Sequence, residues 1–102
     1  PDHTGVASSA NNLGSVLQDQ GDLEGARKCC ERALAIDEKT LGPDHTRVAI
    51  RVNNLGTVLQ DQGDLEGARR CAGRALAIFE SRLGKDHPNS ILARSNLRML
   101  QK

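Results

Sequence analysis

The chain has 102 residues, a length for one modest domain, and its 14 basic and 13 acidic side chains leave a formal net charge of +1. This near balance argues against a basic nucleic-acid-binding arm or a long acidic tail. With no Trp, no Tyr and one Phe, the core must rely on closely packed Leu, Ala, Val and Ile, which suits helices better than sheets. No apolar run approaches the roughly 20 residues of a membrane span, and no signal peptide is visible.

The chain repeats itself with a period of 42 residues. Asn11–Arg27 returns as Asn53–Arg69 with a single Ser-to-Thr change, and residues 1–42 and 43–84 agree at 31 of 42 positions. A period of about 20–50 residues is typical of a stacked-repeat solenoid, in which no unit can bury its apolar face alone. We therefore expect one domain over residues 1–102, divided into repeat 1 (1–42), repeat 2 (43–84) and a C-terminal capping helix (85–102).

The first helix of each copy is predicted to begin after an N-cap at Thr4 or Thr46. In the first copy it runs to about Gln20. Gly21 then ends it, because glycine readily adopts a positive φ.

The second helix of the first copy is predicted to begin after Asp22 as its N-cap and to run to about Leu41. Gly42 ends it and Pro43 prevents its continuation. The two helices are joined by only two residues, so they must fold back antiparallel. Pro88 suits the first turn of the last helix. The sequence thus predicts an all-α fold of five helices: two hairpins and one lone helix.

Gly14 stands in the middle of the first predicted helix, where Gly costs about 1 kcal/mol relative to Ala. Its recurrence as Gly56 predicts a close approach to Ala26 or Ala68 across the hairpin.

The three cysteines show no spacing of a disulfide framework. Cys29 and Cys30 are adjacent, and Cys71 matches Cys29 one period later. They fit buried thiols in a reducing cytoplasm.

The two ends of the chain differ. Leu13 and Val16 are equivalent to Leu55 and Val58, and we expect them to point toward a preceding unit that the chain lacks. Either this is a tolerated exposed patch, or a missing repeat or another chain covers it. Residues 1–42 carry a net charge of −3 and residues 85–102 one of +3. Either this difference favours head-to-tail contact, or it is ordinary variation in surface charge. If a homodimer forms, however, we expect it through the N-terminal end, because apolar burial outweighs screened charge.

The last predicted helix has a polar face. Arg94, Arg98 and Gln101 replace the residues that face a second helix of the same unit, and we interpret them as a solvating cap. Its other face keeps apolar residues for the preceding unit, namely Ile91, Ala93, Leu97 and Leu100.

The pattern Leu13-Gly14, Leu17, Gly21, Ala26, Ala33 resembles a tetratricopeptide repeat. The 42-residue period, with Asn-Asn-Leu-Gly, Ala-Leu-Ala-Ile and Leu-Gly-Pro-Asp-His, resembles the longer variety found in kinesin light chains. The resemblance implies a right-handed α-solenoid of stacked antiparallel helix hairpins, about 2.5 repeats long. Large aromatics usual in the family are replaced here by smaller residues, which suggests a closer-packed hairpin.

The resemblance also implies a concave groove along the first helices, where tetratricopeptide domains bind extended peptides. Asn and Gln suit this work, since each offers a donor and an acceptor to a peptide backbone. The alternative is a merely solvated helix face. The predicted groove residues are Ser8, Asn11, Ser15, Gln18, Asp19, Ile50, Asn53, Thr57, Gln60, Asp61, Ser95 and Met99.

Asn12, Asn54 and Asn96 recur in all three copies although Asn is unfavourable inside a helix, and we expect a buried amide that satisfies the loop of a neighbouring unit. His3, His45 and His87 each follow an Asp. Because they fall in equivalent loops that stacking keeps apart, we expect them to cap loops and not to bind a metal.

Arg27, Arg69 and their basic neighbours on the second helices have acids interleaved and no stacking aromatics, which argues against nucleic acid. Phe79 replaces Asp37 in the second copy, and we expect it to pack near the last helix.

No Gly-rich phosphate loop, nucleophile–base pair or ligand-spaced Cys/His cluster is present, so neither catalysis nor a cofactor is expected. The sequence predicts a cytoplasmic scaffold-type module that binds a protein or peptide, with no membrane partner. The competing hypothesis is a structural one: a stacking or self-association unit through Leu13 and Val16, or a spacer within a larger adaptor or signalling protein.

Overall fold

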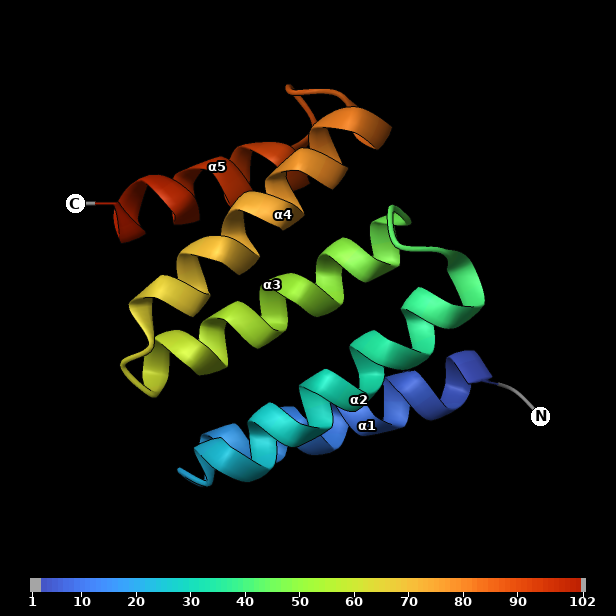
Figure 1. Ribbon diagram of the computed structural model, residues 1–102, viewed down its shortest axis with the longest axis vertical. Helices are drawn as coiled ribbons and strands as arrows, with labels where there is room; N and C mark the ends of the chain where they lie inside the picture. The colour runs from blue at the N-terminus through green and yellow to red at the C-terminus, as the bar shows by residue number, and fades with distance from the viewer. Residues whose placement is uncertain (1–2, 102) are drawn as a thin grey trace.

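Five helices follow one another along the chain in the computed structural model (Figure 1). The structure describes the backbone of residues 3–101 and the side chains of residues 5–101. No strand occurs in this part of the chain, so the predicted all-α fold is confirmed. The helices are α1 (His3–Asp19), α2 (Leu23–Leu41), α3 (Thr46–Asp61), α4 (Leu65–Leu83) and α5 (Pro88–Leu100).

Each helix packs mainly against the next one in the chain, α1 with α2, α2 with α3, α3 with α4 and α4 with α5. In Figure 1 the stack rises from α1 and α2, through α3 and α4, to α5 at the other end. The described chain measures 33 × 32 × 18 Å. This serial packing is that of an α-solenoid, in which each unit touches only its neighbours.

The hairpin turns are set by the residues expected from sequence. Gly21 has a φ of 84° and ends α1, and Gly42 has a φ of 92° at the end of α2. The Asp22 carboxylate accepts a hydrogen bond from the Gly25 backbone N–H at 3.0 Å, as an N-cap does. Pro88 lies in the first turn of α5. These predicted helix boundaries are confirmed, with α1 ending one residue earlier than expected.

Histidine caps α3 and α5, the first helices of the second and third copies. The prediction of Thr46 as N-cap is wrong, because His45 holds that position and its Nδ1 accepts a hydrogen bond from the Arg47 backbone N–H at 3.0 Å. His87 does the same for the Asn89 N–H at 3.1 Å. A neutral imidazole nitrogen is an acceptor and therefore satisfies an N–H that the helix leaves unpaired. The predicted capping role of these two histidines is confirmed.

The core is made of small side chains. Nine of the sixteen buried apolar residues are alanines, which lets the helices approach one another closely. A Cβ added at Gly14 would lie 3.2 Å from the Cβ of Cys29, and one added at Gly56 would lie 3.0 Å from the Cβ of Cys71. The predicted close approach across the hairpin is confirmed, although the nearest atom belongs to a cysteine and not to Ala26.

The C-terminal helix buries only part of the expected face. Ala93 is buried, and the predicted packing of Phe79 near α5 is confirmed, since the two share one core cluster. Ile91, however, is 51% exposed, so its assignment to that face is wrong. Ile91 stands in the register of Ala7 and Ala49, which are buried within their own hairpins, and α5 has no second helix in the described chain.

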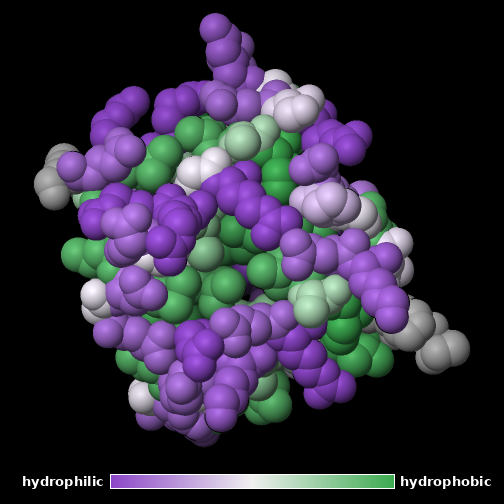
Figure 2. Space-filling model, in the orientation of Figure 1, coloured by the Kyte–Doolittle hydropathy of each residue, from purple (hydrophilic) through white to green (hydrophobic). Residues whose placement is uncertain are grey.

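Hydrophilic side chains cover most of the face shown in Figure 2, and hydrophobic side chains gather in a band across its middle. The described chain contains no helix long and apolar enough to cross a membrane.

Candidate functional site

The twelve residues predicted to line a groove lie on α1, α3 and α5, the first helices of successive repeats. Eight of them are exposed, and four are half-buried, namely Ser8, Asn11, Gln18 and Asn53. The exposed group includes Ile50 and Met99, which carry large apolar side chains. The half-buried group needs separate treatment, because three of its members bond to the next repeat.

Two amide side chains donate hydrogen bonds between α1 and α3. Asn54 Nδ2 donates to Asn11 Oδ1 at 2.9 Å, and Gln18 Nε2 donates to Asp61 Oδ2 at 2.8 Å. Asn54 was expected to satisfy a neighbouring loop, and that expectation is wrong, because its partner is a side chain on a helix. Asn11 and Gln18 therefore hold the repeats in register, and their side chains are only partly available to a ligand.

Asn54 is half-buried, as is Asn96, but Asn12 is exposed. The first copy of this residue is thus more exposed than the other two, which follow another repeat within the described chain.

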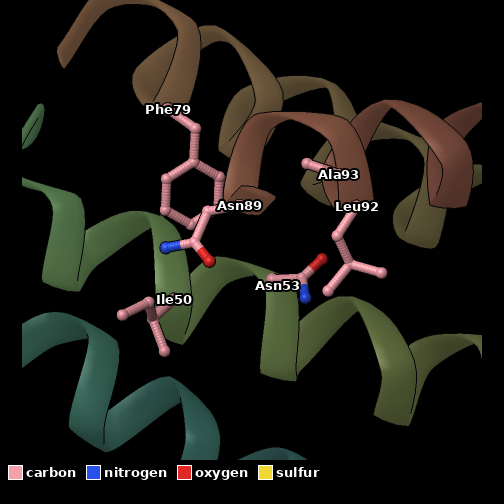
Figure 3. Close-up of a pocket in the computed structure, with 6 residues that line it drawn as sticks. All are labelled: Ile50, Asn53, Phe79, Asn89, Leu92 and Ala93. Carbon is pink, nitrogen blue, oxygen red and sulfur yellow. The ribbon is translucent and has the colours of Figure 1, made fainter. Parts of the chain in front are cut away.

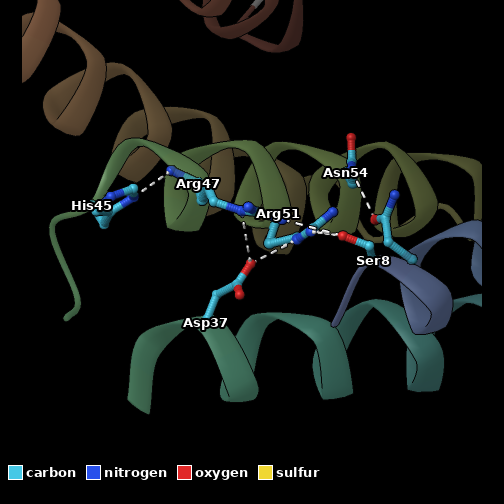
Figure 4. A network of polar contacts seen from close by, with 7 residues as sticks. Ser8, Asp37, His45, Arg47, Arg51 and Asn54 are labelled. Atoms are coloured by element: carbon cyan, nitrogen blue, oxygen red, sulfur yellow. Dashed lines mark hydrogen bonds and ion pairs between the residues drawn. The ribbon is translucent and has the colours of Figure 1, made fainter. Parts of the chain in front are cut away.

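A buried ion pair lies at the joint between α2 and α3 (Figure 4). Arg51 Nε donates to Asp37 Oδ2 at 2.8 Å, and both side chains are buried. Arg47 Nε lies 4.0 Å from the same oxygen. Both arginines also donate to Ser8 Oγ, at 3.2 Å from Arg47 and 3.4 Å from Arg51. Two guanidinium groups thus share one carboxylate, which leaves the joint with a positive charge.

The two arginines line a pocket of about 350 Å³, which we call the arginine pocket. Its lining residues are Ser8, Arg47, Ile50 and Arg51. The Arg47 side chain is 37% exposed and uses one of its five N–H donors on Ser8. Arg47 therefore retains donors that a carboxylate entering the pocket can accept from.

A second pocket of about 200 Å³, the apolar pocket, lies one repeat further along (Figure 3). Ile50 and Asn53 reach it from α3, Phe79 from α4, and Asn89, Leu92 and Ala93 from α5. Leu92 is exposed and Phe79 is buried, so the pocket has an apolar floor and an apolar rim. Ile50 lines both pockets, which makes them neighbours.

The two pockets are equivalent positions of the repeat with opposite chemistry. The equivalent residues, 42 positions apart, are Ser8 and Ile50, Asp37 and Phe79, Arg47 and Asn89, Ile50 and Leu92, and Arg51 and Ala93. The sequence prediction included Ile50 and Asn53 but missed both arginines and the role of Phe79 in a pocket. An alignment of the copies could have revealed the difference between the pockets, because Asp37 and Arg51 are replaced together, by Phe79 and Ala93.

A smaller pocket of about 70 Å³ brings together three predicted groove residues, Asn53, Thr57 and Gln60, with Asn96 and Leu100 of α5. Gly56, Ala68 and Ala72 complete its lining. These polar residues of α3 thus lie next to side chains of the last helix, and their role in a groove stays a prediction.

The three cysteines and the two described histidines, His45 and His87, form no metal site. Within the described residues, no group of three or more His, Cys, Asp or Glu side chains is placed to hold a metal ion. Cys29, Cys30 and Cys71 are free thiols, and burial raises the pKa of Cys30 and of Cys71 above its ordinary value. The side chains of His3 and of Thr4, the predicted cap of α1, lie outside the described residues.

Two arginines of the second helices, Arg27 and Arg69, have partners of their own. Arg27 forms ion pairs with Glu24 at 2.6 Å and Glu31 at 2.9 Å, and its hydrogen bond lowers the pKa of Glu24. Arg69 donates to the Leu100 carbonyl at 2.9 Å and so holds the end of α5. These contacts are structural.

Two consecutive segments of the chain, residues 6–47 and 48–89, match a family model described as tetratricopeptide repeat. Among solved structures, the crystal structure of BtubC (BKLC) from P. vanneervenii matches with a TM-score of 0.89 and 22% sequence identity. The match covers 98% of this chain and 39% of that one, so the chain spans about two fifths of the length of BtubC. No curated protein gives a significant match. The recognition of the 42-residue, kinesin-light-chain-like variety of the repeat is confirmed.

Proposed function

Because the chain belongs to the tetratricopeptide repeat family, whose members generally mediate protein–protein interactions, we propose that it binds an extended segment of a protein partner in the groove of α1, α3 and α5. The observation that carries this proposal is the pair of neighbouring pockets that share Ile50. A segment lying across both can place one side chain in each. We propose no catalytic role, since the repeat is typically a non-enzymatic scaffold.

The chemistry of the pockets indicates which segment fits. Arg47 in the arginine pocket favours a carboxylate, because a guanidinium binds carboxylates through paired N–H donors. Phe79, Ile50 and Leu92 in the apolar pocket favour a large apolar side chain. Asn53 lies at the apolar pocket with donor and acceptor groups suited to the peptide backbone. The proposed ligand is therefore an extended peptide with an acidic residue and a large apolar residue on one side.

We propose that residues 1–102 act as one domain, with the capping helix in 85–102 as the C-terminal end of the groove. The free thiols of Cys29, Cys30 and Cys71 support a reducing, cytoplasmic location. No nucleic-acid or membrane partner is proposed. The alternative is a structural role as a stacking unit, or as a spacer within a larger adaptor or signalling protein.

Selection of a random 12-residue peptide display library on the immobilised chain tests the proposal. We expect enriched peptides to contain an acidic and a large apolar residue, and to bind with micromolar affinity in fluorescence anisotropy. Asn53→Ala combined with Leu92→Ala should weaken this binding about tenfold or more and leave the melting temperature nearly unchanged, because Leu92 is exposed. Arg47→Ala should remove the preference for an acidic residue.

A matched control lies on α2 and α4, the second helices of the two hairpins, which we call the outer helices. Lys28 and Arg70 are exposed equivalents, and Lys28→Ala with Arg70→Ala should leave peptide affinity unchanged. The reverse ranking, with binding lost in the outer variant and kept in the groove variant, would place the site on the other surface. No enrichment over the starting library would favour the structural role.

A further inference from the structure

One apolar face of the stack is open at its N-terminal end. We call this surface the N-terminal face and define it by the exposed side chains of Val6, Leu13 and Val16 on α1. Leu13 is 52% exposed and Val16 is 51% exposed, whereas their equivalents Leu55 and Val58 are 9% and 1% exposed. The same residue types are therefore covered where a repeat precedes them.

The chain itself shows what covers such a face. Leu55 and Val58 pack in one cluster with Ala26 and Cys30, which belong to α2, the second helix of the preceding hairpin. The joint between α4 and α5 is built in the same way, again with a second helix as the cover. At both joints, the helix that covers the equivalent face is the second helix of the preceding hairpin.

Polar contacts at the first joint have unpaired equivalents at the N-terminal face. Arg74 pairs with Glu38 across that joint at 2.6 Å. Arg32 is the equivalent of Arg74; it is exposed and has no ion-pair partner among the described residues. Asn12 and Asp19, the equivalents of two residues hydrogen-bonded across the same joint, are exposed too. An occupant with an acidic residue in the register of Glu38 would pair with Arg32.

The buried pair at each joint differs, and this difference sets the identity of the occupant. Arg51 receives Asp37 at the first joint, and Ala93 receives Phe79 at the second. Ser9 is the equivalent residue of the N-terminal face. A small, uncharged Ser9 resembles Ala93 and offers no guanidinium to a buried carboxylate.

The space beside Ser9 is also large. A pocket of about 470 Å³ opens at the N-terminal face, and its lining residues are Gly5, Val6, Ser9, Ala10, Leu13 and Arg32. Gly5 stands in the register of Arg47, so the second arginine of the first joint is missing as well. This pocket accommodates a bulky apolar side chain, and α1 offers no Lys or Arg to a carboxylate in the register of Asp37. Arg32, which also lines the pocket, is the equivalent of Arg74 and is therefore assigned to the acidic residue in the register of Glu38.

We propose that the N-terminal face binds the second helix of another tetratricopeptide hairpin, whose residue in the register of Asp37 is large and apolar and whose next residue is acidic. A second copy of this chain is not this occupant, although its α4 carries Phe79 followed by Glu80. Its α2 and α4 are already covered by α3 and α5, and its C-terminal helix presents Arg94 and Arg98. If the N-terminal faces of two copies met, the pocket of one would lie against the pocket of the other, and neither copy would supply a side chain to fill it.

The test is to append a hairpin to the N-terminus of the full chain. A second copy of residues 1–42 placed before Pro1 recreates the natural junction, because Leu41-Gly42 is followed by Pro-Asp-His-Thr in both cases. Two versions are compared, one that keeps Asp at the appended equivalent of Asp37 and one that carries Phe there. Urea unfolding is followed by far-UV circular dichroism.

We expect one cooperative transition for the Phe version, with a midpoint roughly 1 M urea or more above that of the Asp version, because the Asp version buries a carboxylate with no partner. Ser9→Arg should reverse the order of the two versions, since it creates at the new joint the equivalent of the pair that Asp37 forms with Arg51. A matched change, Lys28→Arg in the parent part of the chain, should leave the order unchanged.

Equal midpoints for the two versions, or an order that Ser9→Arg does not reverse, would overturn the proposal. Light scattering of the unmodified chain gives a second measurement. A monomer over the accessible concentration range agrees with the proposal. A dimer that Val16→Glu disrupts would assign the N-terminal face to a second copy of the chain and refute it. Neither outcome depends on peptide binding in the groove.

Discussion

The joint between α2 and α3 can be given the buried residues of the joint between α4 and α5. The change is Asp37→Phe together with Arg51→Ala, which copies Phe79 and Ala93 into the equivalent positions. Both side chains are buried, and Arg51 Nε lies 2.8 Å from Asp37 Oδ2. Asp37 Oδ1 has no hydrogen-bond partner within the described part of the chain. The existing pair therefore carries a desolvation cost that its single close contact offsets only in part.

The expected magnitudes follow from this burial. Asp37→Ala alone should destabilise the chain by about 3–5 kcal/mol, because it leaves a buried guanidinium without its carboxylate. Arg51→Ala alone should cost somewhat less, since Arg47 lies 4.0 Å from Asp37 and can approach it. The double change should be neutral or stabilising by about 1–4 kcal/mol, the usual result when packed apolar residues replace a buried ion pair.

Urea unfolding followed by circular dichroism gives these free energies by linear extrapolation, and it suits a chain without Trp or Tyr. Glu38→Ala is the matched control. It breaks the ion pair with Arg74, whose side chains are 36–39% exposed, and should cost only about 0–1 kcal/mol. A double variant as unstable as Asp37→Ala would refute the reasoning, because the two joints would then not be interchangeable.

Two further predictions concern packing and pH. Gly14→Leu and Gly56→Leu should each destabilise by about 1–3 kcal/mol in the same assay, since even a Cβ meets a cysteine Cβ at 3.0–3.2 Å, and parent-like melting of both would contradict this contact. The raised pKa values of Cys30 and Cys71 mean that the folded state keeps thiol protons which the unfolded state loses, so stability should be full below about pH 8.5 and fall above it. The fall, measured as melting temperature against pH, should shrink in Cys30→Ala; an identical profile for that variant and the parent would show that burial of this thiol does not matter.

The sequence alone predicts the helices because their boundaries depend on local chemistry. Gly21 with a positive φ and Asp22 as an N-cap act within a few residues, so their effect is readable from a single chain. The N-cap of α3 was missed for a related reason. Thr46 is a common capping residue, but the adjacent His45 offers an acceptor as well, and only the backbone geometry decides between them.

The groove was harder to predict because its residues depend on the neighbouring repeat. Asn11 and Asn53 are equivalent and are followed by nearly identical sequences, yet Asn11 accepts a hydrogen bond from Asn54 whereas Asn53 lines two pockets. The arginine pocket depends on Ser8 and Arg51, which are 43 residues apart and belong to different repeats. A repeat alignment shows that such positions vary, but it does not show which of them meet.

The change of the buried pair from one joint to the next also protects the chain while it folds. Two copies that share 31 of 42 residues, including a stretch of seventeen with one difference, offer each helix an almost identical wrong partner. If α2 takes the place of α4 against α5, Asp37 meets Ala93 and a carboxylate is buried without a cation. If α4 takes the place of α2 against α3, Phe79 meets the guanidinium of Arg51. Both mistakes bury an uncompensated charge, so misassembled intermediates are disfavoured at the few positions where the copies differ. The order of the repeats is thus encoded in two residues of each joint, while the rest of the sequence stays free to repeat.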